Sequence, residues 1–271
     1  MLHIIGFIVL TSFGQNDTFE HPEMNQTSFL PGEELEYKMK FSIFTVGKGK
    51  AVIQDQLYNF NNRSAYKIDV FGKTSGLVDW IAKVDDHWGS YLDTASLLPH
   101  QAFRNIKEGR YRRNEIVRFD HATNMIEVKV LNQKTGKFKD PEFYYAPGRQ
   151  IFDMMGGMMY FRSLDFDKIN VGDTLVVDTF LENTFYNFQT VFSGKEIIKT
   201  KLGKFRSLVL VPIMPDNSLF KGENAIKIWI SDDKNKMPLR AEAEMFIGSA
   251  GLEIIGFKGL RNPVSSFVLG S

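Results

Sequence analysis

The residues of this chain that could do chemistry are few, and the most informative lie in an apolar stretch at residues 152–162. A charged side chain in apolar surroundings needs a partner, because an unpaired buried charge is costly. Nine helical positions at about 100° each place Asp153 and Arg162 on opposite sides of a helix, so they cannot pair with each other. The preferred interpretation is that each forms an ion pair with the surrounding sheet. The alternative is a ligand site made by Asp153, Gly157, Tyr160 and Arg162.

The histidines form no recognisable metal-binding motif. His21, His87, His100 and His121 lie far apart, and none has the spacing of a His-x-x-x-His or His-Glu-x-x-His zinc motif. Asp85 and His87 could share one face of a strand, since alternate residues of a strand point the same way, but a polar strand edge is the simpler interpretation. The sequence therefore predicts no metal site and no cofactor.

Motifs of nucleophilic and nucleotide-dependent catalysis are missing from the sequence. It contains no Gly-x-Ser-x-Gly elbow, no Walker loop and no Gly-x-Gly-x-x-Gly between a strand and a helix. The sequence Gly47-Lys-Gly49 precedes a strand and is typical of a hairpin turn. Carboxylates are numerous, but no pair is distinguished as a general acid and base. No catalytic residue is predicted, and we expect the protein not to be an enzyme.

One short segment is strongly basic: residues 107–114 include Lys107, Arg110, Arg112 and Arg113. A solvated hairpin tip is the simpler interpretation. The alternative is contact with an anionic surface such as lipid headgroups or glycan, which would make the protein a peripheral membrane binder.

The central apolar stretch predicts a buried helix near 149–164. Pro147 suits a helix start, and Arg162 suits the last turn. Four methionines make the helix apolar around most of its circumference, as is typical of a buried helix (Met154, Met155, Met158 and Met159). Gly156 and Gly157 each cost about 1 kcal/mol relative to alanine in mid-helix, which indicates that something packs closely against the backbone.

The rest of the chain consists of short runs that alternate polar and apolar residues, the pattern of β-hairpins. About fourteen strands are expected on the two sides of the helix, with no change of composition typical of a linker. The sequence predicts a mainly β protein, a curled antiparallel sheet or open barrel-like β-roll with one central buried helix. We expect one domain over 30–262 and a C-terminal tail at 263–271.

The composition is that of an ordinary globular protein, with 43% hydrophobic and 24% charged residues. Lys and Arg number 33 against 32 Asp and Glu, so the basic excess typical of a nucleic-acid binder is missing. Neither a nucleic-acid partner nor a transmembrane span is predicted.

Residues 1–14 form an apolar run without Asp, Glu, Lys or Arg. The run is shorter than the roughly 20 residues that span a bilayer, and it matches a secretory signal with a cut ahead of Gln15. A buried N-terminal strand is the alternative. Because the sequence has no cysteine, we expect neither disulfides nor the lipid anchor of bacterial lipoproteins. We expect export to the periplasm or the extracellular space, with a flexible lead-in at 15–29.

Several short motifs follow one another in an order that resembles one bacterial envelope family: Gly32–Tyr37, Leu98-Pro99, Phe119-Asp120, Asp153 before a helix that ends Tyr160–Arg162, Gly194–Ile197, Gly203–Phe205, and Ile228–Asp233 before Met237–Leu239. The family is domain of unknown function number 3108, and the resemblance covers about Pro31 to Leu260. It implies a secreted or periplasmic β-rich domain with no assigned activity. The stretch Trp229–Pro238 carries a looser similarity to the periplasmic lipoprotein-carrier folds (LolA/LolB-like), a fold-level analogy.

Taken together, the sequence predicts an exported cell-envelope protein, and we favour a non-enzymatic binder of an apolar or amphipathic ligand or of an envelope partner such as lipid, glycan or protein. One alternative is a hydrolase acting on envelope glycan or lipid, and another is a structural scaffold without a small ligand. An apolar cavity would favour the binder. Convergent acids in one cleft would favour the hydrolase, and a filled core with an exposed apolar patch would favour the scaffold.

Overall fold

The computed structural model of the chain describes residues 21–268, apart from 77, 78, 80–82, 149, 215–221 and 223. The signal peptide expected at 1–14 lies outside the described residues, as does the first part of the lead-in.

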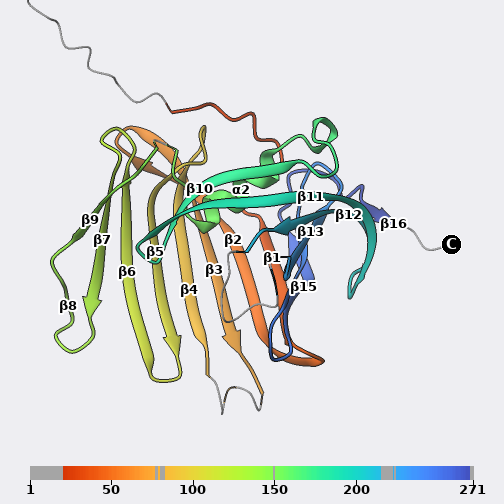
Figure 1. Ribbon diagram of the computed structural model, residues 1–271, viewed down its shortest axis with the longest axis horizontal. Helices are drawn as coiled ribbons and strands as arrows, with labels where there is room; N and C mark the ends of the chain where they lie inside the picture. The colour runs from red at the N-terminus through yellow and green to blue at the C-terminus, as the bar shows by residue number, and fades with distance from the viewer. Residues whose placement is uncertain are drawn as a thin grey trace, which may run out of the picture.

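One antiparallel sheet of sixteen strands makes up most of the described chain (Figure 1). The first half of the chain supplies β1 (Glu34–Phe41), β2 (Phe44–Phe60), β3 (Arg63–Thr74), β4 (Asp85–Asp93), β5 (Pro99–Glu108), β6 (Tyr111–Asp120), β7 (Met125–Asn132), β8 (Lys137–Phe138) and β9 (Glu142–Tyr145). The second half supplies β10 (Thr174–Leu181), β11 (Thr184–Thr200), β12 (Gly203–Pro212), β13 (Ile226–Ser231), β14 (Pro238–Glu244), β15 (Ser249–Lys258) and β16 (Phe267–Val268). The predicted mainly β fold with one helix is confirmed.

The order of the strands in the sheet consists of two runs, and within each run the strands are neighbours in sequence order. It runs from β10 to β15, passes from β15 to β1, and then runs from β1 to β8. Nearly every neighbour is therefore a hairpin partner, as alternation and turn signals predict. The tight turn between β2 and β3 shows why the hairpins form: Asn61 and Asn62 both have positive φ (50° and 63°), which the favoured two-residue hairpin turns require.

The sheet curls without closing into a barrel. One edge strand is β10, and the other edge lies at β7, where β8 and β9 pair. The extended segment before the helix connects the two edges, because Phe152 in this segment forms a β-bridge with Thr179 of β10. A hydrophobic cluster fills the remaining space between the edges, and Ile151 and Phe180 belong to it together with residues of β6 and β7.

The single described α-helix, α2 (Met154–Ser163), lies inside this curl, between the long strands β2 to β5 and the crossing strands β10 and β11 (Figure 1). It begins later than the expected start near 149. The reason is that Phe152 is held extended by two backbone hydrogen bonds to β10, with Asp178 (2.8 Å) and Phe180 (2.9 Å). A short 3-10 helix, η1 (Phe166–Lys168), follows.

The N-terminal end of the described chain differs from the flexible lead-in expected at 15–29. Phe29 is fully buried, and Ser28 Oγ donates a hydrogen bond to the carbonyl oxygen of Arg162 (2.5 Å). The second half of the expected lead-in is thus part of the core, because it covers the end of α2. At the other end, β16 pairs with β12.

Candidate ligand-binding site

Three cavities border the methionine-rich face of α2. The largest has a volume of about 220 Å³ and lies between α2 and strands β10 to β13. Its wall is almost entirely apolar and includes Gly157, Met158, Phe161, Phe188 and Leu210. A second cavity of about 80 Å³ lies against β1 to β3, and a third of about 40 Å³ lies near Trp88 and Arg104.

Flexible methionine side chains form the walls between these cavities. Met154 borders the largest and the third, Met155 the second and the third, and Met158 the largest and the second. Met159 alone of the four is buried, while Met154 is 47% exposed. All four methionines border a cavity, Met159 the second one, whereas the sequence predicted a helix that is buried around most of its circumference. Because methionine adopts many shapes at low cost, rotation of these side chains can join the cavities.

One residue that lines the largest cavity carries a buried polar atom without a hydrogen-bond partner. Thr190 occupies an inward-facing position of β11 between Phe188 and Phe192, and its side chain is 1% exposed. Its Oγ1 has no hydrogen-bond partner among the described residues. Such a group costs free energy unless something outside the protein satisfies it. Sequence reasoning missed Thr190, because a single threonine in a strand carries no signal.

Asp153 caps the helix and forms no ion pair with the described residues. Its Oδ1 accepts a hydrogen bond from the backbone N–H of Gly156 (2.7 Å), the usual role of an N-cap aspartate. Burial raises the pKa of the Asp153 carboxyl to about 6, against the lowering effects of Ser90 and of the Gly156 hydrogen bond. Ser90 Oγ itself lacks a hydrogen bond of ordinary geometry. The preferred ion-pair interpretation is therefore wrong for Asp153.

Arg162 does form the expected ion pair between helix and sheet. Its guanidinium donates to both carboxylate oxygens of Glu33 (2.6 and 2.9 Å), the residue just before β1, and to the carbonyl oxygen of Asn235 (3.0 Å). Both charged side chains are buried. Arg162 borders the second cavity, but its donors are already engaged, which leaves little capacity for an anionic ligand.

The two helix glycines differ in their surroundings. A Cβ atom on Gly156 would lie 2.9 Å from Asp153 Oδ1 and 3.2 Å from the carbonyl oxygen of Leu97, whereas one on Gly157 would meet nothing closer than Val177 Cγ2 at 3.9 Å. The close packing predicted for the pair is thus found at Gly156. Gly157 instead faces the largest cavity.

The four predicted ligand residues do not converge on one site. Gly157 borders the largest cavity, Arg162 the second and Asp153 the third. Tyr160 packs against Phe152, with ring centroids 5.3 Å apart, beside the main hydrophobic core. Among these four, Gly157 is the residue that the geometry favours as part of a ligand site.

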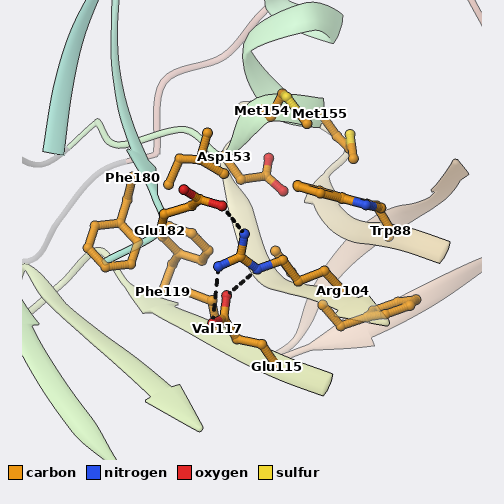
Figure 2. Close-up of a pocket in the computed structure, with 14 residues that line it drawn as sticks. Trp88, Arg104, Glu115, Val117, Phe119, Asp153, Met154, Met155, Phe180 and Glu182 are labelled. Atoms are coloured by element: carbon orange, nitrogen blue, oxygen red, sulfur yellow. Dashed lines mark hydrogen bonds and ion pairs between the residues drawn. The ribbon is translucent and has the colours of Figure 1, made fainter. Parts of the chain in front are cut away.

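The third cavity brings acidic groups together (Figure 2). Arg104 Nε contacts Glu115 Oε1 (2.8 Å), its Nη1 contacts Glu182 Oε1 (2.9 Å), and its guanidinium lies over the ring of Trp88. Asp153 borders the same cavity. These are the convergent acids that a hydrolase would need, but both glutamates pair with Arg104. The volume of about 40 Å³ has room for water and none for a glycan or lipid substrate.

Three histidines that are far apart in the sequence lie close together in the fold. The ring centroid of His21 is 6.0 Å from that of His100 and 5.8 Å from that of His121. Turns at one end of the sheet bring His100 and His121 together, beside a polar groove that also contains Arg63. Burial and then the charge of Arg63 lower the pKa of His21 to about 4. Among the described residues, no group of three or more His, Cys, Asp or Glu side chains is arranged to hold a metal ion.

Across the described residues, no helix has the length and apolar character needed to cross a membrane.

Comparisons with known proteins identify a family and a fold. The family model described as "Protein of unknown function (DUF3108)" matches residues 36–255. No curated protein matches the chain. The crystal structure of a β-barrel-like protein of domain of unknown function DUF1849 from Brucella abortus is 9% identical and has a TM-score of 0.54, with 85% of this chain and 98% of that chain covered.

A second structure, the hypothetical protein CT021 from Chlamydia trachomatis, has a TM-score of 0.37 at 12% identity over 89% of this chain and 93% of that one. The likeness to the Brucella protein shows a β-barrel-like fold alone. The expected likeness to lipoprotein-carrier folds is not shown by these structures and stays a prediction.

Proposed function

The chain belongs to the DUF3108 family of proteins of unknown function, and from its own cavities we propose that it is a non-enzymatic binder of an amphipathic ligand. The ligand class is a molecule with an apolar chain and a small polar group, such as an envelope lipid. The apolar run at 1–14 supports export, with N-terminal sequencing of protein from the native host as its test; retention of Met1 would contradict it.

The observation that carries this proposal is the apolar cavity of about 220 Å³, which is lined among others by Thr190, a residue with a buried, unsatisfied hydroxyl. An engineered apolar cavity of about 150 Å³ is large enough to bind benzene, so this one accommodates a segment of an acyl chain. A cavity left empty forfeits the dispersion contacts of its lining. A bound chain would restore them.

The wall composition specifies the ligand further. The cationic groups of Arg162 and Arg104 already pair with carboxylates near the helix, so a free anionic headgroup has no evident partner beside the cavity. Rotation of the Thr190 side chain would turn its buried Oγ1 toward the cavity, where a hydroxyl or ester carbonyl of the ligand would form the missing hydrogen bond. Rotation of Met154 and Met158 would admit longer chains, because these side chains separate this cavity from its neighbours.

The test has two parts. Native mass spectrometry of protein purified from its own host should detect copurified lipid. Titration with a dansyl-labelled fatty acid ester should then show binding that Gly157→Leu weakens, because a leucine there projects into the cavity. Gly72→Leu is the matched control, since a Cβ at Gly72 meets nothing within 4 Å and Gly72 does not border this cavity.

Thr190→Val tests the polar contact separately. It replaces the hydroxyl by a methyl group of the same shape, so it should weaken binding of the ester probe and leave binding of a plain alkane unchanged. Thr184→Val, at an exposed position of the same strand, is the control. If no lipid copurifies and Gly157→Leu binds the probe as well as the wild type, the scaffold interpretation replaces the binder.

A further inference from the structure

Two neighbouring hairpin turns expose large apolar side chains at one end of the sheet. The turn between β1 and β2 and the turn between β14 and β15 carry five such residues, here named the tip patch: Phe41, Ile43, Phe44, Phe246 and Ile247. Ile43 is 88% exposed and Ile247 is 82% exposed. These positions are not part of the core or of any cavity described above.

Backbone contacts hold the two turns side by side. Ser42 N–H donates to the carbonyl oxygen of Ser249 (2.6 Å), and Phe41 lies opposite Ala250 in the ladder. Ser42 and Gly248 both have positive φ (52° and 76°), as tight turns require. Both hairpins end at the lower edge of the sheet in Figure 1. The tip patch is therefore a fixed projection of the fold.

Lysine and arginine side chains lie behind the tip patch and at the same end of the sheet. Lys48 and Lys73 face each other across β2 and β3, and neither forms an ion pair with the described residues. Another turn at the same end of the sheet, between β5 and β6 and separated from the β1–β2 turn by the β3–β4 connection, belongs to the basic segment 107–114. There Arg112 donates only to backbone carbonyl oxygens, of Gly109 and Tyr111.

An apolar projection with exposed lysine and arginine side chains at the same end of the sheet matches the surface of a bilayer that contains anionic lipids. Exposed apolar clusters of this kind on soluble proteins mark interaction sites. Aromatic and aliphatic side chains enter the boundary between headgroups and acyl chains by roughly 5–10 Å, while Lys and Arg attract the anionic headgroups. We propose that the tip patch docks the protein on an anionic membrane, with Lys48, Lys73 and the 107–114 turn facing the headgroups.

A vesicle sedimentation assay with the full chain tests this docking. Wild-type protein should sediment with vesicles of equal parts phosphatidylglycerol and phosphatidylcholine, and much less with phosphatidylcholine alone. The double variant Ile43→Glu, Ile247→Glu should bind about ten-fold more weakly or worse, since two large apolar side chains no longer enter the lipid. Lys48→Glu should weaken binding at low salt and have less effect at high salt.

The control is Ile197→Glu, which changes a side chain that is 61% exposed on β11, a strand that carries no residue of the tip patch. It should sediment as the wild type does. Both exposed-site variants should keep the wild-type melting temperature, since no core contact is lost.

Three outcomes would overturn the proposal. The wild-type protein could fail to sediment with anionic vesicles, the double variant could sediment as well as the wild type, or the Ile197→Glu control could lose as much binding as the double variant. Concentration-dependent self-association that the double variant abolishes, with no vesicle binding, would instead assign the tip patch to a second copy of the chain. The docking is independent of the proposed cavity: the double variant should still bind the dansyl ester in solution, and Gly157→Leu should still bind vesicles.

Discussion

At the scale of single residues, Asp153 makes the stability depend on pH. Burial raises the pKa of its carboxyl from 3.8 to about 6, so the folded state binds a proton more tightly than the unfolded state. The stabilisation from this proton is fully present below the unfolded pKa and is lost as pH rises through the folded pKa. At neutral pH the buried carboxylate thus costs about 3 kcal/mol relative to the protonated form, by order of magnitude.

We expect Asp153→Asn to be more stable than the wild type at pH 7.5, with an advantage that shrinks as pH falls from about 6 to about 4. Asparagine caps a helix about as well as aspartate and carries no charge to bury. Asp153→Ala also removes the buried charge but loses the cap, so at every pH it should be less stable than Asp153→Asn by about 1 kcal/mol. Thermal melts across this pH range measure both, and an advantage of asparagine that does not vary with pH would contradict the assignment.

The two helix glycines should respond in opposite directions to alanine. At Gly157 the methyl group has room, so alanine should gain up to about 1 kcal/mol of helix stability. At Gly156 the methyl group would press on Asp153 and on the Leu97 carbonyl, so alanine should be destabilising by about 1–3 kcal/mol. Urea denaturation of the two variants is the measurement. Equal effects of the two substitutions would show that the cavity beside Gly157 is not open.

The sequence predicted which residue types would matter, but their partners only in part. Arg162 was expected to pair with the sheet and does so with Glu33. Asp153 was also expected to pair with the sheet, because the sequence placed it inside a helix near 149–164. The helix in fact begins at Met154, which makes Asp153 its N-cap. The proximity of the three histidines and the position of Thr190 beside a cavity could not be predicted from the sequence, since both depend on contacts between distant segments.

At the scale of elements, the buried ion pair between Arg162 and Glu33 and a set of apolar contacts hold α2 in place inside the sheet. The alternation of residues predicted the strands well, because each inward face must be apolar. The start of the helix was misplaced because Ile151 and Phe152 suit a strand and a helix equally. Only the bridge to β10 decides between them, and the sequence does not reveal that neighbour.

Removal of one partner of the Glu33–Arg162 pair should destabilise the protein strongly. Arg162→Met leaves the carboxylate of Glu33 buried and uncompensated, which typically costs about 3–5 kcal/mol. The double variant Glu33→Met, Arg162→Met should recover much of this loss, because hydrophobic replacement of a buried pair is often neutral. Denaturant unfolding measures the cycle. A double variant that is as unstable as Arg162→Met would show that the pair's polar contacts, such as the one to Asn235, are required.

At the scale of the whole molecule, the sheet is a roll with a seam between β10 and the strands β7 and β9. Among the described residues, no ladder of backbone hydrogen bonds closes this seam. It is held by the extended residue Phe152, which bridges to β10, and by a hydrophobic cluster. In this cluster the ring of Phe180 packs on the rings of Tyr144 and Phe185, with centroid distances of 5.2 and 5.0 Å. A seam of side chains opens more readily than a hydrogen-bonded ladder, and it lies beside the cavities of α2. We expect it to be the part of the roll that opens first.

Phe180→Ala should therefore increase hydrogen exchange in β7, β9 and β10 more than in β1 to β3, in addition to a loss of stability of about 3–5 kcal/mol. Phe205→Ala is the matched control, because Phe205 is fully buried in the separate cluster against β1 and β15. It should cost a similar stability without selective exchange at the seam. Exchange that rises in the same strands for both variants would mean that the roll opens as one cooperative unit, with no local opening of the seam.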